Sequence, residues 1–262
     1  MLKKNRDWFA KLLKKVGHYQ LERQAEINPT SSDHKSRIDL VTDVDRESER
    51  RLVKALEQRF PADGILAEEE IEKSSENDCR WIIDPLDGTT NYVHHHPFFG
   101  ISIGRQKQGK LSEAYAYFPY LDDFYCAGHE EGAFKNDARI EVSKNSDPLK
   151  ALMATGFADM RTESERYNLP VFQRIIRDVQ GIRRAGSAVH DLCLTAEGVF
   201  DGFWEYNLSA WDVAAGALLV KEAGGKVTDM AGGDDWLTGK HIVASNATSL
   251  HGWLLEKVDV PQ

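Results

Sequence analysis

The chain has 262 residues, 41% of them hydrophobic, which predicts a globular protein with a large core, built as one domain or as two halves that share an interface. The net charge of −9, from 33 basic and 42 acidic residues, argues against a nucleic-acid-binding protein, which normally carries excess positive charge. The longest apolar stretches, such as residues 213–220, are too short to span a bilayer, so we expect no membrane segment.

The N-terminal stretch MLKKNRDWFAKLLKK begins with positive charge but lacks the uninterrupted apolar core of a signal peptide. The three cysteines, Cys79, Cys126 and Cys193, are far apart, odd in number and form no CxxC pair. This usage favours a reducing compartment over a disulfide framework, so we expect a cytoplasmic protein.

Helical spacing of apolar side chains predicts a first helix over residues 5–25. Residues 28–40 are polar and rich in turn-forming residues, so a loop is expected there, followed by a second helix over 45–60. After Pro61 come short strands around 64–67, 81–84, 98–104, 111–119 and 122–128. The tight turns between them carry Gly or Asp, which is typical of an antiparallel sheet.

From about residue 148 strands and helices alternate. The expected elements are a strand in 151–157, helices over 168–179 and 187–200, a strand over 202–206, a helix over 212–223 closed by two glycines, a strand over 241–245 and a final helix. An antiparallel half followed by an alternating half predicts two layered subdomains, 1–147 and 148–262, with a cleft between them.

Four separate stretches end a predicted element with carboxylates: residues 39–45, 65–70, 82–88 and 210–216. Negative charge at the tip of a buried element has to be compensated, and no run of Arg or Lys accompanies these acids. Hard divalent cations such as Mg²⁺, which take oxygen ligands, would provide that compensation.

The spacing within residues 84–90 favours such a site. Asp84 and Asp87 would point to opposite faces of a regular strand, but Pro85 turns the chain, so both can converge on one point. Gly88 allows close approach of the backbone, and the N–H groups of Gly88 and Thr89 can face an anion. Other acids allow a second interpretation: Asp212 and Asp45 could each cap a helix, and residues 68–70 could be a solvated run.

Two long stretches carry a family resemblance: WIIDPLDGTTNYVHHHPFFGISIG (81–104) and WDVAAGALLVKEAGGKVTD (211–229). With DLVTDVD (39–45) and the acidic pair after GILA, they resemble the inositol monophosphatase family of Mg²⁺-dependent, lithium-sensitive phosphatases. The resemblance covers essentially the whole chain. It implies a layered αβαβα sandwich, with an antiparallel sheet in the N-terminal half and a mixed sheet in the C-terminal half, an active site between the subdomains, and a homodimer.

The resemblance also implies roles for individual residues. The metal ligands would be the side chains of Glu68, Asp84, Asp87 and Asp212, together with the backbone carbonyl group of Leu86. Most of these lie in the N-terminal subdomain, and two or three Mg²⁺ ions are expected. Asp45 and Thr89 would position or deprotonate the attacking water, and Glu68 is grouped with them as catalytic.

On the substrate side, Gly88 and Thr89 would cradle the phosphate, Glu205 would bind hydroxyl groups, and Ala188 in the AGSA stretch and Asp212 would contact the substrate. Two departures from the family pattern leave choices open. His34 and Lys35 both lie near the position where many relatives have a lysine. The AEEE stretch leaves a choice between Glu68 and Glu69, of which alignment favours Glu68.

The expected reaction is hydrolysis of a small phosphate monoester, first of all inositol 1-phosphate, by direct attack of metal-activated water. Related enzymes that hydrolyse histidinol phosphate, fructose 1,6-bisphosphate, NADP or 3′-phosphoadenosine nucleotides offer alternative substrates. Arg183 and Arg184 could reach a second phosphate or cap a surface helix. A non-enzymatic alternative is a protein partner of the transcription or ribosome-assembly machinery, without direct binding of nucleic acid.

Overall fold

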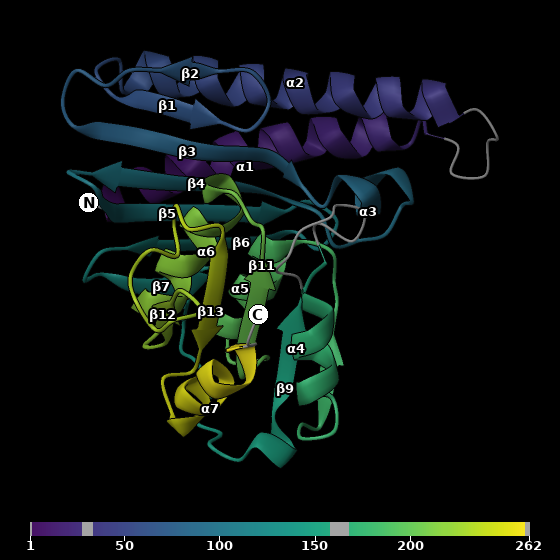
Figure 1. Cartoon of the computed structure of the whole chain (residues 1–262). Coiled ribbons are helices and arrows are strands. Elements are labelled where there is room, and N and C mark those ends of the chain that lie inside the picture. Colours follow the sequence, from purple (N-terminus) through teal and green to yellow (C-terminus); the bar gives the residue numbers. More distant parts are fainter. Residues whose placement is uncertain (1, 28–33, 158–167, 260–262) are drawn as a thin grey trace.

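The structure is a computed structural model that describes residues 2–27, 34–157 and 168–259. Helices and sheets alternate in five layers (Figure 1). The long helices α1 (Leu2–Gln24) and α2 (His34–Arg59) form the first layer and cover one face of the first sheet. The predicted αβαβα sandwich is confirmed.

The first sheet has eight strands in the order β2-β1-β3-β4-β5-β6-β7-β8. Their bounds are β1 (Gly64–Ala67), β2 (Glu72–Lys73), β3 (Cys79–Asp87), β4 (Gly100–Lys107), β5 (Lys110–Phe118), β6 (Asp123–Gly128), β7 (Gly132–Lys135) and β8 (Ala138–Ile140). All neighbours are antiparallel except β1 and β3, which run parallel. The exception arises because the two-residue strand β2 reverses the chain after β1, so that β3 returns in the direction of β1.

The second sheet has five strands in the order β10-β9-β11-β13-β12. Their bounds are β9 (Leu152–Thr155), β10 (Gly181–Arg183), β11 (Gly202–Tyr206), β12 (Lys226–Thr228) and β13 (His241–Ser245). The first three in spatial order are parallel, and β13 is antiparallel to both of its neighbours, so the sheet is mixed, as predicted. The two sheets fall on either side of the short helix η1 (Pro148–Lys150), where the predicted subdomain boundary lies.

The remaining helices complete the layers. Helices α5 (Ala188–Ala196) and α6 (Ala210–Glu222) lie between the two sheets, and α4 (Asn168–Ile175) and α7 (Ser249–Val258) cover the outer face of the second. The short helix α3 (Thr89–Val93) follows β3 directly. Within the described ranges no helix combines the length and apolarity needed to cross a membrane.

Helix α2 begins earlier than the sequence indicated. The polar stretch 28–40 was expected to be a loop, but residues 34–40 are helical, and 28–33 lie outside the described residues. Val41 and Val44 explain the longer helix, since both are buried in a cluster with Leu86, Tyr92 and Phe99. This burial extends the helix through polar residues because packing outweighs local propensity. The side chains of His34 and Lys35 lie outside the described part, so the choice between them stays open.

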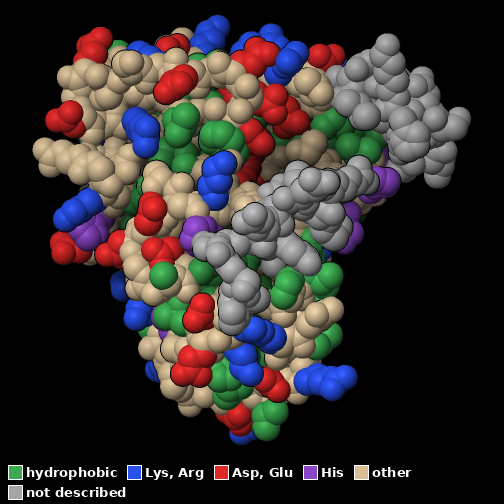
Figure 2. All heavy atoms as spheres, viewed as in Figure 1, with side chains coloured by type: hydrophobic (Ala, Val, Ile, Leu, Met, Phe, Trp, Pro, Cys, Tyr) green, Lys and Arg blue, Asp and Glu red, His purple; other side chains and the backbone are tan. Residues whose placement is uncertain are grey.

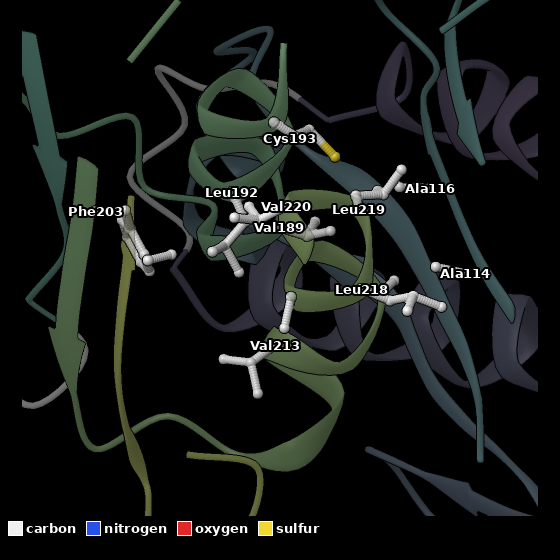
Figure 3. Packing of buried hydrophobic residues seen from close by; sticks show 14 of the residues in the cluster. Ala114, Ala116, Val189, Leu192, Cys193, Phe203, Val213, Leu218, Leu219 and Val220 are labelled. Carbon is white, nitrogen blue, oxygen red and sulfur yellow. The ribbon is translucent and has the colours of Figure 1, made fainter. Parts of the chain in front are cut away.

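The middle helical layer is packed closely from both sides (Figure 3). Leu218 and Leu219 of α6 lie toward the small side chains of Ala114 and Ala116 on β5, whereas Val220 lies on the side of Leu192 and Val189 of α5. Between α5 and α6, Gly216 allows the backbones to approach: a Cβ atom there would lie 2.5 Å from the Cβ of Leu192. Helix α6 is apolar on all sides because it is buried between two sheets.

Two glycines in helices test this packing. Gly216→Ala should destabilise the fold by about 1–3 kcal/mol, because the added methyl group overlaps Leu192. Gly252→Ala on α7, where no described residue outside the local helix backbone comes within 4 Å of the added Cβ, should instead be neutral or stabilise by up to about 1 kcal/mol. Urea denaturation of both variants measures the difference; equal stabilities would contradict the close contact of α5 and α6.

Candidate active site

The turn at the end of β3 brings two aspartates to one side. Trp81, Ile82 and Ile83 are fully buried, and the pairing with β4 then shifts: Asp84 lies opposite Ser102 and Asp87 opposite Gly100. From Asp84 to Asp87 strand β3 advances three residues while β4 advances two, so β3 contains a β-bulge with one extra residue. Because side chains alternate along a strand, the extra residue brings positions three apart onto the same face. This is the convergence that Pro85 predicted.

Asp84 and Asp87 are both buried, with exposures of 1% and 9%. Asp84 Oδ1 accepts a hydrogen bond from the Leu86 N–H at 2.9 Å. Burial raises the pKa of Asp84 well above its usual range, and the charges of Glu68, Asp87 and Asp212 act in the same direction. Burial also raises the pKa of Asp87, to about 6, against the opposing effect of its hydrogen bonds.

The N-terminus of α5 holds Asp87 in place. Asp87 Oδ2 accepts hydrogen bonds from Ser187 Oγ at 2.7 Å and from the Val189 N–H at 2.8 Å. Ser187 is also the N-cap of α5, where its side chain accepts from the His190 N–H. Ala188, the predicted substrate contact, is the first residue of α5 and is 8% exposed. A residue from the C-terminal half thus positions a carboxylate of the N-terminal half.

Gly88 and Thr89 follow at the start of α3. Gly88 has a φ of 88°, and a Cβ atom there would lie 2.8 Å from the carbonyl oxygen of Phe98, so the position requires glycine. Thr89 is exposed and its hydroxyl donates to the Leu86 carbonyl oxygen at 3.2 Å. The predicted phosphate-binding residues and the predicted carbonyl ligand therefore lie in one tight turn.

Asp212 shows that helix capping and a place in the acidic cluster are compatible. It is the third residue of α6, and its Oδ2 accepts a hydrogen bond from the N–H of the N-cap residue Ser209 at 2.6 Å. The surrounding protein raises the pKa of Asp212 to about 7, with further contributions from the charges of Asp87 and Glu68. One carboxylate oxygen caps the helix and the other remains available.

Glu68 and Asp45 approach the cluster from the other side. Glu68 directly follows β1; although the residue is exposed, displacement of water by nearby protein atoms raises its pKa to about 7, and its side chain hydrogen-bonds to Asp84. That contact supports Glu68 over Glu69 as the member of the cluster. Asp45 is 5% exposed; burial raises its pKa to about 8, and the neighbouring Glu69 and Glu68 raise it further. It lies inside α2, so the alternative that Asp45 caps a helix is wrong.

Glu205 lies on β11 in the second sheet and is 5% exposed. Its carboxylate packs against Gly156, where a Cβ atom would overlap it. Glycine at position 156 therefore leaves the room that the buried carboxylate occupies. Its binding of substrate hydroxyl groups stays a prediction.

Among the described residues, no three His, Cys, Asp or Glu side chains are already arranged to hold a metal ion. Asp84, Asp87 and Asp212 each turn one oxygen toward a donor of the protein. Each carboxylate keeps a second oxygen, and oxygen donors without sulfur or nitrogen suit Mg²⁺. The chemistry of this donor set therefore fits the ion that the sequence predicts.

Acidic side chains gather on one face of the molecule where the surface is hollowed next to α2 (Figure 2). Sequence reasoning found the acids but missed Ser187 and Val189, the donors that fix Asp87. A serine before an apolar helical stretch, as in AGSAV, is a common N-cap pattern and could have pointed to the start of α5. Its contact with Asp87, 100 residues away in the chain, could not be read from that pattern.

Comparison with known proteins agrees with this fold. The family model described as "Inositol monophosphatase family" matches residues 7–260. A protein named "Putative Nus factor SuhB" from Neisseria meningitidis serogroup B is 42% identical over 237 residues, covering 90% of this chain and 91% of that protein. An "Inositol-1-monophosphatase" from Mesorhizobium japonicum is 39% identical and covers 79% of each chain.

A solved structure, the inositol monophosphatase from Anabaena (Nostoc) sp., superposes with a TM-score of 0.84 at 35% identity and covers 98% of both chains. The suhB protein from Bartonella henselae gives a TM-score of 0.85 at 36% identity, over 95% of this chain and 97% of that one. The fold and the family match thus define a phosphatase. The chain belongs to the inositol monophosphatase family, whose members are generally metal-dependent.

The pKa shifts predict how pH changes the stability of the metal-free protein. Folding raises the pKa values of Asp45, Glu68, Asp87 and Asp212 from about 4 to between about 6 and about 8. A carboxyl group whose pKa is raised by folding stabilises the protein below its unfolded pKa, and this contribution is lost as pH rises through the folded value. In EDTA, the melting temperature should therefore fall between pH 5.5 and pH 8.5.

Saturating Mg²⁺ should reduce that fall, because a cation replaces the protons that the cluster otherwise requires. Asp45→Asn should make the decline above pH 7 shallower, since it removes the group with the highest of the printed values. Thermal denaturation followed by circular dichroism measures both effects. A metal-free protein that is more stable at pH 8.5 than at pH 5.5 would contradict the proposed electrostatics.

Proposed function

We propose that this protein hydrolyses small phosphate monoesters with the help of Mg²⁺, with inositol 1-phosphate as its first substrate. The observation that carries the proposal is the meeting of acids from four segments, namely α2, the loop after β1, the end of β3 and the start of α6. So many carboxylates with raised pKa values in one place are an unstable arrangement unless cations bind there.

The residues that would hold the ions are the side chains of Glu68, Asp84, Asp87 and Asp212 and the carbonyl group of Leu86. Two or three Mg²⁺ ions fit this number of oxygen donors. When bound, Mg²⁺ supplies Lewis-acid polarisation of the phosphate and activation of water.

The chain itself would bind and orient the reactants. Gly88 and Thr89 would direct N–H groups toward the phosphate, with the left-handed φ of Gly88 setting the turn. Asp45 and Thr89 would orient the attacking water, and Asp45 would accept its proton. Burial, which raises the pKa of Asp45 to about 8 in the metal-free protein, makes its ionised form a stronger base than that of a free aspartate.

The second half of the site would determine the substrate. Glu205, a buried carboxylate, can accept hydrogen bonds from the hydroxyl groups of a polyol, and Ala188 and Asp212 would contact the same side of the substrate. Histidinol phosphate, fructose 1,6-bisphosphate, NADP and 3′-phosphoadenosine nucleotides are the alternatives to compare. Three buried, unpaired cysteines support the proposal of a reducing, cytoplasmic environment, and a homodimer is the assembly that we propose with it.

Asp87→Asn should lower phosphatase activity by several orders of magnitude, because it removes a charge from the metal site while an amide oxygen can still accept from Ser187 and Val189. Turnover is measured by phosphate release from a panel of the five substrate types, with Mg²⁺ and with or without Li⁺. Glu70→Gln is the control, since Glu70 is an exposed acid paired with Arg46 in the same loop as Glu68. Near-normal activity of the Asp87 variant would remove Asp87 from the site.

A second candidate function is binding of a protein partner, for which a groove between α1 and α2 provides the evidence. Two adjoining hollows of about 460 Å³ each share Leu12, Lys15, Ala55 and Gln58. Their remaining lining residues are Trp8, Lys11, Val16, Arg51, Lys54 and Arg59. The floor is apolar, the walls carry five basic side chains, and no acid of the described part of the chain lines either hollow.

The charge of this groove contrasts with that of the whole chain. Residues 2–24 hold seven Lys or Arg and two Asp or Glu, a net charge of +5 in a chain of net −9. Arg51 pairs with Glu47 and Arg59 donates to Asn5, whereas Lys11, Lys15 and Lys54 have no ionic or hydrogen-bonded partner among the described residues. We propose that the groove takes an acidic, amphipathic segment of a protein.

Proteins of the transcription or ribosome-assembly machinery are the partner class to examine, because several relatives bear the name Nus factor SuhB. A floor of Leu12, Val16 and Ala55, with Trp8 as the one aromatic side chain among the described lining residues, favours a peptide over a single-stranded nucleic acid, which would require several aromatic side chains to stack successive bases.

The double variant Lys15→Glu, Lys54→Glu should weaken binding of an acidic Glu/Leu helical peptide of about 15 residues by roughly tenfold or more, because two attractive charges become repulsive. Fluorescence anisotropy of the labelled peptide gives the affinity. Lys3→Glu with Lys4→Glu is the matched control, since both side chains are exposed on α1 outside the hollows. Equal binding by both double variants, or tighter binding of an RNA oligonucleotide of similar length, would contradict this role.

A further inference from the structure

Glu49 is a buried carboxylate that contacts the loop carrying Glu68. It lies on α2, one helical turn after Asp45, and is 1% exposed. Its Oε2 accepts a hydrogen bond from the Glu69 N–H at 2.8 Å, and its Oε1 accepts from the N–H groups of Glu70 and Ile71, both at 3.0 Å. Three consecutive backbone donors of one loop therefore converge on a single side chain.

These hydrogen bonds restrict the loop between β1 and β2. The loop is closed at its base by the hydrogen bond from the Ala67 N–H to the Ile71 carbonyl at 3.0 Å. Glu68 itself donates its N–H to the Ile83 carbonyl of β3 at 3.1 Å. Glu68 is thus held between β3 on one side and the three donors bound by Glu49 on the other, with its carboxyl group against Asp84.

The placement of Glu49 has an electrostatic cost. Its charge adds to the repulsion felt by Asp45, Glu68 and Glu69, all of which have raised pKa values. A glutamine would avoid that repulsion, but its NH₂ group would face backbone donors, and its single oxygen could not accept from all three. The negative charge is needed to bind the loop, as in other concave sets of backbone N–H groups.

Gln20 of α1 links α2 with the other acidic segment. Its Nε2 donates to the Pro85 carbonyl at 2.7 Å and to Ser48 Oγ of α2 at 3.2 Å, so it bridges α2 and the turn that carries Asp84 and Asp87. Helix α2 is thus joined directly through Glu49 to the loop that carries Glu68, and through Ser48 and Gln20 to the turn after β3.

We propose that Glu49 is a positioning residue, which fixes the loop 68–71 relative to α2 so that Glu68 and Asp45 face the same ion site. The inference rests on the proposed function as far as the ion site is concerned. In the sequence, Glu49 follows Asp45 by four residues, a spacing that places both carboxylates on the same face of α2.

Glu49→Gln tests this role, with Glu47→Gln as the matched control. Glu47 lies on the same helix, and among the described residues its side chain pairs with Arg50 and Arg51 near the surface and with no part of the loop 68–71. Isothermal titration of Mg²⁺ into metal-free protein should show binding weakened by about 10- to 100-fold in Glu49→Gln and unchanged in Glu47→Gln. In the metal-free variant, hydrogen exchange at the amides of residues 69–71 should become faster.

A merely structural role would lower the melting temperature but leave the Mg²⁺ affinity of the folded protein unchanged, and that result would overturn the proposal. If Glu49→Gln does not fold, Glu49→Asp, which keeps the charge with a shorter reach, should show a smaller loss of affinity and faster exchange at the same amides; normal values for both would likewise overturn it. A different result would show that the proposed function is wrong: the wild-type protein would bind Mg²⁺ but release no phosphate from any ester in the panel.

Discussion

Burial of several neighbouring carboxylates is the constraint around which this structure is organised. Asp84, Asp45 and Asp87 are buried, and Glu68 and Asp212 complete the group. Burial disfavours the charged form and raises all five pKa values, and the charges of neighbouring acids raise those of Asp45, Glu68, Asp84 and Asp212 further. The rest of the fold has to supply the free energy that keeps them together, and it does so through a large core in five layers.

The acids are held individually by neutral donors and not by basic side chains. Backbone N–H groups of Leu86, Val189 and Ser209 bond to Asp84, Asp87 and Asp212, and each bond occupies one oxygen. Such donors fix orientation without neutralising charge, so the cluster keeps its capacity for cations. The pattern separates this site from a structural ion-pair network such as that of Arg105, which binds Asp63 and Glu113 directly. Metal-dependent phosphatase chemistry is consistent with acids that are held by neutral donors and keep their charge.

Much of this could be predicted from the sequence, because the strongest signals are local. Apolar periodicity located most helices and strands, and the spacing Asp84-Pro85-Leu86-Asp87 indicated convergent acids. Short strands such as β2 and β12 were missed because two or three residues carry no period, and the parallel pairing of β1 with β3 depends on such a strand. The early start of α2 was missed because its buried face alternates with polar residues. The contacts of Ser187 and Glu49 join distant segments, which no local pattern records.

The bulge at the end of β3 places a condition on how this protein can vary in length. Alternation along a strand is a matter of odd and even positions, and one extra residue between Asp84 and Asp87 converts opposite sides into the same side. Losing a single residue there would leave the two aspartates two apart in a regular strand and still on one face, but it would remove one of the two backbone units between them, which bond to Gln20 and to Asp84. Substitutions in this turn keep that backbone, whereas a change of one in its length removes part of it. The number of residues, as much as their identity, is therefore part of what makes this site.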